Sequence, residues 1–295
     1  MKILITGASG FIGRQCCAQL IAQGHEVHAT SLKNQTDDKV QWYKVDLFDA
    51  QQSIKLMRKI QPTHLLHLAW YAEPGKYWTS TKNYHWVKAS LTLFEEFVKV
   101  GGTRLVVAGS CAEYSWESEK YTEDKTPLEP GTLYGVCKHS LHTMLASYAS
   151  LKGLSFAWGR IFSIYGPHEN PNRLFASVIQ ALLKDHNVKC NNGGLIRDYL
   201  HVYDVASAFI ALLNSEVEGP INIGSGSGIT LEDTVRKIEK KISNYGRLKI
   251  NHEPISSYEA PIIIADTTRI NNIGWSPLYN INHGLDNTIK WFEKK

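Results

Sequence analysis

Short apolar runs alternate with longer amphipathic segments through the first half of the chain. The apolar runs predict strands at 1–6, 26–29, 40–45, 63–68, 105–109 and 156–162. Apolar residues that recur every three to four positions predict helices at 14–23, 53–60, 86–100 and 134–151. The run 105–109 is apolar throughout, which is typical of a strand buried on both faces of a parallel sheet. This alternation predicts an α/β fold that is doubly wound around a parallel sheet.

The second half of the chain is less regular. Beyond residue 165 the predicted elements are a loop and a helix at 174–184, a strand edge and helix at 201–213, a strand at 220–223, a helix from the cap Thr230 to about 241, a strand at 262–265 and a helix through Trp291. Neither an internal repeat nor a low-complexity linker separates the two halves. We therefore expect two parts that interleave along the chain.

Composition and charge narrow the classes of function. The chain has 295 residues, of which 43% are hydrophobic and 20% charged, as in an ordinary globular protein. Its net charge of +4 comes without long basic runs, so we expect no nucleic-acid partner, and the small excess suits an anionic ligand. The sequence has no secretory signal pattern and no apolar run long enough to span a bilayer, so we expect no membrane partner.

The cysteines and histidines argue against metal binding and disulfides. The five cysteines are odd in number and have no C-x-x-C spacing, and the 12 histidines are scattered. Reduced thiols are typical of the cytoplasm, so we expect a cytoplasmic protein without a metal site.

Three glycines follow the first predicted strand. Gly7, Gly10 and Gly13 have the spacing G-x-x-G-x-x-G and lead directly into the first helix. Glycines at such a turn let the backbone approach a pyrophosphate, and a helix start offers free N–H groups to it. The stretch therefore predicts a dinucleotide site.

A tyrosine and a lysine lie four residues apart on the predicted helix 134–151. Tyr134 and Lys138 therefore project from the same helix face, about one turn apart. A nearby ammonium group favours the phenolate and lowers the tyrosine pKa, so the pair can exchange a proton with an alcohol or sugar oxygen.

Several ordered motifs support one resemblance. They are TGASGFIG (6–13), VDL (45–47), HLA (67–69), Ser110 four residues before Tyr114, YGVCK (134–138), RIFS (160–163) with YGP (165–167), RDY (197–199) leading into HVYDVA (201–206), and IGWSP (273–277). With these motifs the chain resembles the extended short-chain dehydrogenase/reductases, in the branch of NAD(P)-dependent nucleotide-sugar epimerases, dehydratases and reductases. The resemblance implies an NAD(P)-binding Rossmann domain at 1–164, with segments near 198–225 and 260–270 returning to it, and a smaller C-terminal lobe, mainly for the nucleotide sugar, at 165–295.

The resemblance also implies roles for individual residues. The expected catalytic residues are Ser110, Tyr134 and Lys138. The expected cofactor-binding residues are Gly7, Ser9, Gly10, Phe11, Ile12, Gly13, Arg14, Ser31, Lys33, Asp46, Leu47, Leu68, Ala69, Trp70, Tyr134 and Lys138. The expected substrate-binding residues are Ser110, Cys111, Ser163, Arg173 and Arg197. Arg197 would contact the diphosphate, because a guanidinium group binds phosphate oxygens in bidentate fashion.

The end of the second predicted strand indicates the cofactor. Ser31 lies where an NAD-type enzyme of the family has an acid for the ribose 2′-hydroxyl, Lys33 follows, and Arg14 comes directly after the glycine motif. A missing acid beside two cations suits the 2′-phosphate, so we expect NADP(H), with NAD(H) as the alternative.

Departures from the family pattern bear on the reaction. Cys111 and Ala112 stand where 4,6-dehydratases carry an Asp-Glu pair, which disfavours dehydration. Trp86 and Ser163 each stand where the family often has asparagine. The aromatic stretch 71–84 is predicted to be a loop, either over the cofactor or substrate or packed between the lobes.

The leading hypothesis is an NADPH-dependent 4-ketoreductase that acts on a nucleotide-linked 4-keto-6-deoxy sugar in deoxysugar biosynthesis. An NAD-dependent nucleotide-sugar 4-epimerase is the first alternative. A C3/C5 epimerase-reductase would need an acid and a base, for which His168 and Cys111 are the candidates. A dinucleotide-sensing protein without turnover ranks last, because such proteins usually lose the tyrosine or the lysine. Helices 86–100 and 134–151 are expected to pair two chains in a homodimer.

Overall fold

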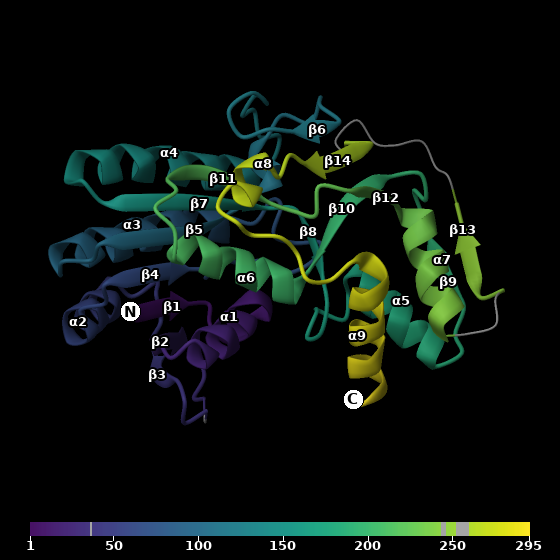
Figure 1. Cartoon of the computed structure of the whole chain (residues 1–295), viewed down its shortest axis with the longest axis horizontal. Coiled ribbons are helices and arrows are strands. Elements are labelled where there is room, and N and C mark those ends of the chain that lie inside the picture. The colour runs from purple at the N-terminus through teal and green to yellow at the C-terminus, as the bar shows by residue number, and fades with distance from the viewer. Residues whose placement is uncertain (36, 243–245, 252–259) are drawn as a thin grey trace. The chain divides into compact units, whose positions relative to one another are not determined.

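Two compact units make up the chain. The computed structural model describes residues 1–35, 37–242, 246–251 and 260–295 (Figure 1). Unit 1 contains Met1–Tyr114, Leu128–Arg160 and Ala206–Ile221, and unit 2 contains Ser115–Pro127, Ile161–Val205 and Asn222–Lys295. Each unit is therefore built from segments that are separated in the sequence.

A seven-stranded sheet forms the centre of unit 1. Its strands are β1 (Lys2–Thr6), β2 (Glu26–Ser31), β3 (Gln41–Lys44), β4 (His64–His67), β5 (Arg104–Ser110), β7 (Ser155–Ile161) and β11 (Gly219–Ile223). The order is β11-β7-β5-β4-β1-β2-β3, and the pairs from β3 through β5 are parallel. This order, which runs outward in both directions from β1, confirms the predicted Rossmann-type fold.

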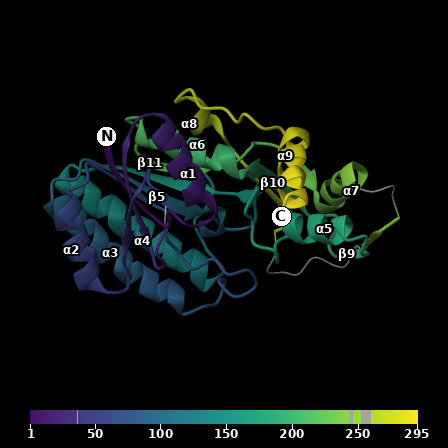
Figure 2. The same ribbon diagram turned by 90° about the horizontal axis from the view of Figure 1, so that it is seen from below.

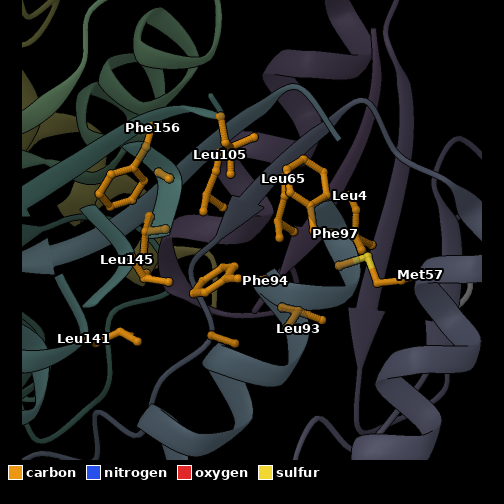
Figure 3. Close-up of a cluster of buried hydrophobic side chains, with 14 of the residues drawn as sticks. Leu4, Met57, Leu65, Leu93, Phe94, Phe97, Leu105, Leu141, Leu145 and Phe156 are labelled. Atoms are coloured by element: carbon orange, nitrogen blue, oxygen red, sulfur yellow. The ribbon is translucent and has the colours of Figure 1, made fainter. Parts of the chain in front are cut away.

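Helices lie on both faces of this sheet. They are α1 (Phe11–Ala22), α2 (Ala50–Ile60), α3 (Lys82–Lys99), α4 (Leu133–Lys152) and α6 (Val202–Leu213). Figure 2 shows α2, α3 and α4 side by side on one face, with α1 and α6 on the other. In the core under α3, Phe94 and Phe97 pack among Leu65 of β4 and Leu105 of β5 (Figure 3). Burial of such side chains stabilises the fold by about 1.5–3 kcal/mol each.

Local capping decides where two of these helices begin. The Asp49 carboxylate accepts hydrogen bonds from the N–H groups of Gln51 and Gln52, so α2 starts at Ala50, three residues earlier than the apolar spacing predicts. The Thr132 hydroxyl accepts from the N–H of Gly135 and caps α4. Gly153, at φ 62°, ends α4 in the left-handed conformation that glycine adopts without strain.

A buried arginine ties the returning segment to the rest of unit 1. Arg104 on β5 is 4% exposed. Its guanidinium donates to the hydroxyl of Ser155 at 2.6 Å and to the carbonyls of Leu212 and Val217 at 2.6 and 2.8 Å. The last two acceptors lie just before β11, so this cation fixes the path of the chain into the outer strand of the sheet.

Unit 2 has its own strands and its own apolar core. Its strands are β6 (Lys120–Tyr121), β8 (Ser163–Tyr165), β9 (Val188–Cys190), β10 (Ile196–His201), β12 (Gly228–Thr230), β13 (Leu248–Ile250) and β14 (Ile262–Ala265). Its helices are α5 (Leu174–Leu183), α7 (Leu231–Ile242), α8 (Thr268–Asn271) and α9 (Ile281–Glu293). Strand β10 pairs with β8, β12 and β14, and α5, α7 and α9 pack together around Phe175, Ile238 and Leu285.

Among the described residues, no helix is both long and apolar enough to cross a membrane.

Candidate active site

The glycine turn between β1 and α1 leaves room only for glycine. Gly7 has φ 69°, and a Cβ there would lie 2.7 Å from the backbone nitrogen of Ala69. A Cβ on Gly13 would lie 2.2 Å from the Gly7 carbonyl oxygen, so only glycine lets α1 pack this closely on the turn. Gly10 caps α1 without a side-chain hydrogen bond, which leaves the first helical N–H groups available for an anion. The turn therefore fits a pyrophosphate, with Ser9, Phe11 and Ile12 completing it.

The residues predicted to bind the 2′-phosphate of NADP lie at the end of β2, directly after β2, and on α1. Strand β2 runs two residues further than predicted and ends at Ser31, whose hydroxyl accepts from the N–H of Lys33 at 3.1 Å and from the Gln35 amide at 3.3 Å. Lys33 is exposed. The Arg14 guanidinium is also exposed and donates to the Ser9 and Gly10 carbonyls at 2.8 and 3.3 Å, beside the glycine turn.

The other predicted cofactor residues follow β3 and β4. Asp46 is exposed and accepts from the N–H of Phe48 at 2.9 Å, whereas Leu47 beside it is buried. After β4, the N–H of Ala69 donates to the Thr6 hydroxyl at 3.3 Å. Because β1 to β4 are parallel, their carboxyl ends meet at one edge of the sheet, where ligands of open α/β sheets bind. The preceding residue, Leu68, and the following one, Trp70, lie at the same strand end.

Helix α4 carries the tyrosine and the lysine in its first two turns. A Cβ on Gly135 would lie 2.2 Å from the carbonyl oxygen of Ala112, so glycine lets the helix start approach the end of β5. The half-buried ring of Tyr134 packs edge-on against Tyr77 and Trp78, with ring centroids 4.9 and 5.7 Å away. The N–H of Tyr134 donates to the Trp78 carbonyl at 3.1 Å. These contacts fix both the ring and the backbone of the tyrosine.

Lys138 is buried between a carbonyl group and an indole ring. Its side chain is 3% exposed, and Nζ donates to the Ala108 carbonyl at 2.7 Å. Nζ also lies 3.7 Å from the centroid of the Trp70 ring, a cation–π distance. Burial lowers the pKa of Lys138 to about 7, against the opposing charge of Glu113. The side-chain amine of Lys138 can therefore change between its charged and neutral forms near neutral pH.

Ser110 is the last residue of β5, and its backbone bonds a buried ionic cluster. Its hydroxyl accepts from the N–H of Ala112 at 3.2 Å, and its own N–H donates to Glu113 Oε1 at 2.8 Å. Glu113 is fully buried and also accepts from Trp158 Nε1 at 2.9 Å and from Arg160 Nε at 3.0 Å. This Glu113 cluster (Glu113, Trp158, Arg160 and Tyr114) fixes the backbone that carries the serine.

Glu113 also lies near two histidines, and the three side chains are of types that can ligate a metal, but their surroundings are poorly suited to one. The ligand atoms of Glu113, His139 and His142 lie within 4.8 Å of one another. Both Glu113 oxygens, however, already accept hydrogen bonds, and the Arg160 cation lies beside them. Burial, followed by the charges of Arg160 and His139, lowers the pKa of His142 to about 3. A buried dication next to a guanidinium group would be costly, so the geometry disfavours a metal here.

The predicted substrate residues fall in both units. Cys111 is half-buried beside Ser110 in unit 1, in the short helix η1 (Cys111–Glu113). In unit 2, Ser163 on β8 pairs with Tyr199 on β10, and Arg197 of β10 donates to the Ile196 carbonyl at 2.9 Å. Arg173 is the half-buried N-terminal cap residue of α5.

His168, the alternative acid or base, is an exposed residue of unit 2. It has φ 73°, and its ring lies 4.6 Å from that of Trp291. Its described packing is therefore with the final helix of its own unit.

Two buried residues of the site were not singled out from the sequence. Glu113 bonds the Ser110 backbone, and Asn83 bonds the aromatic segment that packs on Tyr134. A polar residue in the first turn of a helix is usually interpreted as a solvated cap. Their partners Trp158 and Trp70 lie 45 and 13 residues away, so local patterns carry no signal for either contact.

Comparison with known proteins confirms the resemblance that the motifs indicate. The model of the NAD dependent epimerase/dehydratase family matches residues 3–224. UDP-glucuronic acid decarboxylase 1 of Xenopus tropicalis is 25% identical over 308 residues, which cover 100% of this chain and 72% of that protein. dTDP-4-dehydro-6-deoxyglucose reductase of Escherichia coli is 26% identical over 309 residues, which cover 98% of this chain and 96% of that protein.

Solved structures show the same fold. The structure of UDP-glucose 4-epimerase from Thermus thermophilus in complex with NAD has a TM-score of 0.87 and 24% identity, and covers 99% of each chain. The expected fold and the expected class, an enzyme that depends on NAD or NADP, are thus confirmed.

Proposed function

Because this chain belongs to the NAD dependent epimerase/dehydratase family, we propose that it is an NADPH-dependent 4-ketoreductase. Its proposed substrate is a nucleoside-diphosphate-linked 4-keto-6-deoxy sugar, whose ketone it reduces to an alcohol in deoxysugar biosynthesis. The observation that carries the proposal is that Ser31 at the end of β2 replaces an acid, while Lys33 just after β2 and Arg14 on α1 are exposed cations. A net reductase draws on NADPH, whereas an epimerase of this family returns the hydride to its own substrate.

The residues of unit 1 can carry out this reduction. The glycine turn around Gly7 and Gly13 fits a dinucleotide, and when bound the nicotinamide supplies a hydride to the ketone carbon. Tyr134 donates its phenolic proton to the ketone oxygen, which completes the alcohol. The Ser110 hydroxyl holds this oxygen beside the tyrosine. Lys138 favours the phenolate that remains and holds the cofactor ribose.

Cations of unit 2 are proposed to bind the diphosphate of the substrate. Arg197 is 9% exposed and bonded to the carbonyl of Ile196, so its guanidinium is oriented in advance. Arg173 and Ser163 are proposed to contribute further contacts. The E. coli relative, a dTDP-4-dehydro-6-deoxyglucose reductase, supports a 4-keto-6-deoxy sugar as the substrate class.

A 4-epimerase is the second candidate. The T. thermophilus neighbour is a UDP-glucose 4-epimerase, and its structure contains NAD. An epimerase would convert its substrate without net consumption of cofactor, and this difference separates the two candidates.

The decisive experiment is a panel of GDP-, dTDP-, UDP- and CDP-linked 4-keto-6-deoxy sugars with NADPH. We expect one of them to be reduced with one NADPH oxidised per sugar, followed by nicotinamide absorbance and by product analysis. Interconversion of a nucleotide sugar at C4 with catalytic NAD and no net oxidation would overturn the proposal in favour of the epimerase.

Cofactor titration tests the observation at β2 directly. We expect tighter binding of NADPH than of NADH, and Lys33→Ala should reduce NADPH affinity roughly tenfold, because a charged hydrogen bond contributes about 1.5–3 kcal/mol. Lys39→Ala, an exposed lysine of the same loop, is the control and should leave both affinities unchanged. Equal or tighter binding of NADH by the unaltered protein would remove the reason to prefer a reductase.

We also propose a homodimer formed through α3 and α4. The two helices pack together, and they expose Tyr84, Val136, Met144 and Leu151, which are 67%, 43%, 42% and 78% exposed. Light scattering should give twice 33.2 kDa for the unaltered chain and a lower mass for Val136→Glu/Met144→Glu. Leu278→Glu, an exposed leucine of unit 2, is the matched control. A mass of 33.2 kDa for the unaltered chain would contradict the proposal.

A further inference from the structure

Asn83 is a fully buried amide in the first turn of α3. Its Nδ2 group donates to the Tyr77 carbonyl at 2.6 Å and to the Ser80 carbonyl at 2.9 Å. Its Oδ1 atom accepts from Trp70 Nε1 at 2.8 Å. One side chain therefore bonds the end of β4 and two points of the segment between β4 and α3.

The chemistry of these partners requires an amide in this orientation. An indole N–H can only donate, so the oxygen of Asn83 must face Trp70, and a carbonyl can only accept, so the NH₂ group must face Tyr77 and Ser80. A carboxylate could not serve both sides, because it has no hydrogen to donate. Both N–H donors and one lone pair of the oxygen are used in one defined arrangement.

The partners of Asn83 are the groups that hold the tyrosine and the lysine. The Trp70 ring lies under the Lys138 ammonium, 3.7 Å from Nζ to the ring centroid. Tyr77 and Trp78 pack edge-on against the ring of Tyr134, and the Trp78 carbonyl accepts from the Tyr134 N–H at 3.1 Å. Asn83 thus reaches Lys138 through the Trp70 side chain and Tyr134 through Tyr77, whose backbone it bonds and whose ring packs on Tyr134.

We propose that Asn83 is the positioning residue that fixes Tyr134 and Lys138 relative to each other. It acts through Trp70 on the lysine and through the segment 77–80 on the tyrosine, and it takes no part in proton transfer itself. This inference rests on the proposed function, in which Tyr134 and Lys138 carry the chemistry. Positioning matters because a displacement of about 1 Å in a catalytic group reduces the rate by about 10²-fold.

The neighbourhood of α3 explains why this position supports such a role. Trp86, one turn further along α3, stacks on Trp70 with centroids 6.1 Å apart and an interplanar angle of 24°. The stack with Trp86 therefore fixes the plane of the Trp70 ring, and the hydrogen bond to Asn83 fixes how the ring is rotated within that plane. Stacking alone would allow the Trp70 indole to slide parallel to the Trp86 ring, whereas the hydrogen bond to Asn83 fixes its position under Lys138.

Two substitutions at Asn83 form the test, and Thr288→Val is the matched control. Thr288 is a fully buried residue of α9 whose hydroxyl bonds the Gly284 carbonyl, so its replacement removes a buried hydrogen bond away from the catalytic pair. Asn83→Leu removes all three hydrogen bonds at similar volume. We expect kcat to fall by about 10²-fold with a smaller change in KM, whereas Thr288→Val should leave kcat within about twofold.

Asn83→Asp supplies a readout that a purely structural role would not move. The new carboxylate would keep the bond from Trp70 but face the carbonyls of Tyr77 and Ser80, and burial near those oxygens raises its pKa. At acid pH the protonated group can donate to the Tyr77 carbonyl again. The ratio of kcat for Asn83→Asp to that of the unaltered enzyme should therefore rise as pH falls, and that of Asn83→Leu should stay flat.

Further measurements keep the proposal separate from the proposed function. Trp70→Phe keeps an aromatic ring under Lys138 but loses the indole N–H. It should fold even where Asn83→Leu fails to fold, because the buried amide stays in place. We expect its kcat to fall by about tenfold. NADPH affinity, measured without any sugar, should weaken in Asn83→Leu because Lys138 shifts. The inference is overturned if both Asn83 variants and Trp70→Phe keep kcat and NADPH affinity within about twofold while Tyr134→Phe is inactive. An active Tyr134→Phe would instead refute the catalytic assignment.

Discussion

Two buried cations of unit 1, Arg160 and Lys138, have different surroundings. Arg160 is fully buried and bonded to the Glu113 carboxylate at 3.0 Å and to the Tyr114 hydroxyl at 3.0 Å. Lys138 is also buried, but it contacts the Ala108 carbonyl and the face of Trp70, with the Trp158 ring further away at 5.9 Å. Burial alone would lower the pKa of Arg160, but Glu113 and then Tyr114 outweigh it and raise that pKa. For Lys138, burial wins and the pKa falls to about 7.

The difference separates a cation that supports the fold from one that is proposed to serve the reaction. The Glu113 carboxylate raises the pKa of Arg160, so this guanidinium group stays charged. A carbonyl and an indole stabilise an ammonium group less, so the charge of Lys138 responds to its surroundings. The predictions below test this contrast, from the largest expected effect to the smallest.

The two tyrosines should separate most clearly. Tyr134→Phe should lower turnover by about 10²–10⁴-fold and leave thermal stability unchanged, because the ring still packs but the acid is lost. Tyr114→Phe should keep turnover but lose about 1.5–3 kcal/mol of unfolding free energy, because Arg160 loses a hydrogen-bond acceptor. Turnover assays and denaturant unfolding of both variants check this. Near-normal turnover of Tyr134→Phe would break the contrast.

The two cations should respond in opposite ways to replacement by methionine. Arg160→Met leaves Glu113 charged and unpaired in the interior, and should cost about 3–5 kcal/mol of unfolding free energy. Lys138→Met replaces a buried cation by an apolar chain, so stability should be equal or higher while turnover falls by about 10²-fold. The double variant Glu113→Gln/Arg160→Met should recover part of the lost stability. Marked destabilisation by Lys138→Met would show that Lys138 also supports the fold.

Stability and activity should move in opposite directions with pH. The pKa of Lys138 is about 7 in the folded chain, against 10.5 for an ordinary lysine. Between these values the unfolded chain binds one more proton, so this group makes the fold more stable as pH rises from 7 towards 10.5. Turnover that needs the ammonium should fall as pH rises through 7. Unfolding of the unaltered protein and Lys138→Met at about pH 6 and pH 9 measures this contribution, since the variant should lack the rise.

Ser110 joins the two environments and should show the smallest effect. Its N–H donates to Glu113, and its hydroxyl is proposed to bond the sugar oxygen. Ser110→Ala keeps the N–H bond to Glu113 but removes the hydroxyl that accepts from the Ala112 N–H, so the unfolding free energy should fall by about 1 kcal/mol. It also removes one proposed neutral hydrogen bond to the sugar, so turnover should fall by roughly three- to tenfold. The assay that detects Tyr134→Phe resolves this difference. A loss larger than that of Tyr134→Phe would assign the proton transfer to the serine instead.

Features that depend on near neighbours in the chain could be predicted from the sequence. The glycine turn and the pair Tyr134 and Lys138 are set by spacings of three or four residues, and the alternation of apolar runs gives the Rossmann-type sheet. Boundaries were less accurate: α1 begins at Phe11 instead of residue 14, because Gly10 caps the helix through its backbone alone.

The residues that support Tyr134 and Lys138 could not be predicted. The role of Glu113 depends on Trp158 and Arg160, which reach it only after β7 has joined the sheet beside β5. The role of Asn83 depends on an indole at the end of another strand. In both cases the sequence shows a polar residue near the start of a helix, and only the fold reveals that it is buried. The same holds for the pKa of Lys138, which burial determines.

The return of the chain to β11 sets a delay during protein synthesis. Arg104 leaves the ribosome long before its acceptors, since Val217 is 113 residues later. At a synthesis rate of about 5–20 residues per second, the carbonyl of Val217 is made about 6–23 seconds after Arg104. Until then the outer edge of β7 is also without the strand that covers it, and an open edge invites pairing with another chain. The nascent enzyme is therefore most exposed to aggregation after β1 to β7 are complete but before β11, the last strand of the seven-stranded sheet, has emerged.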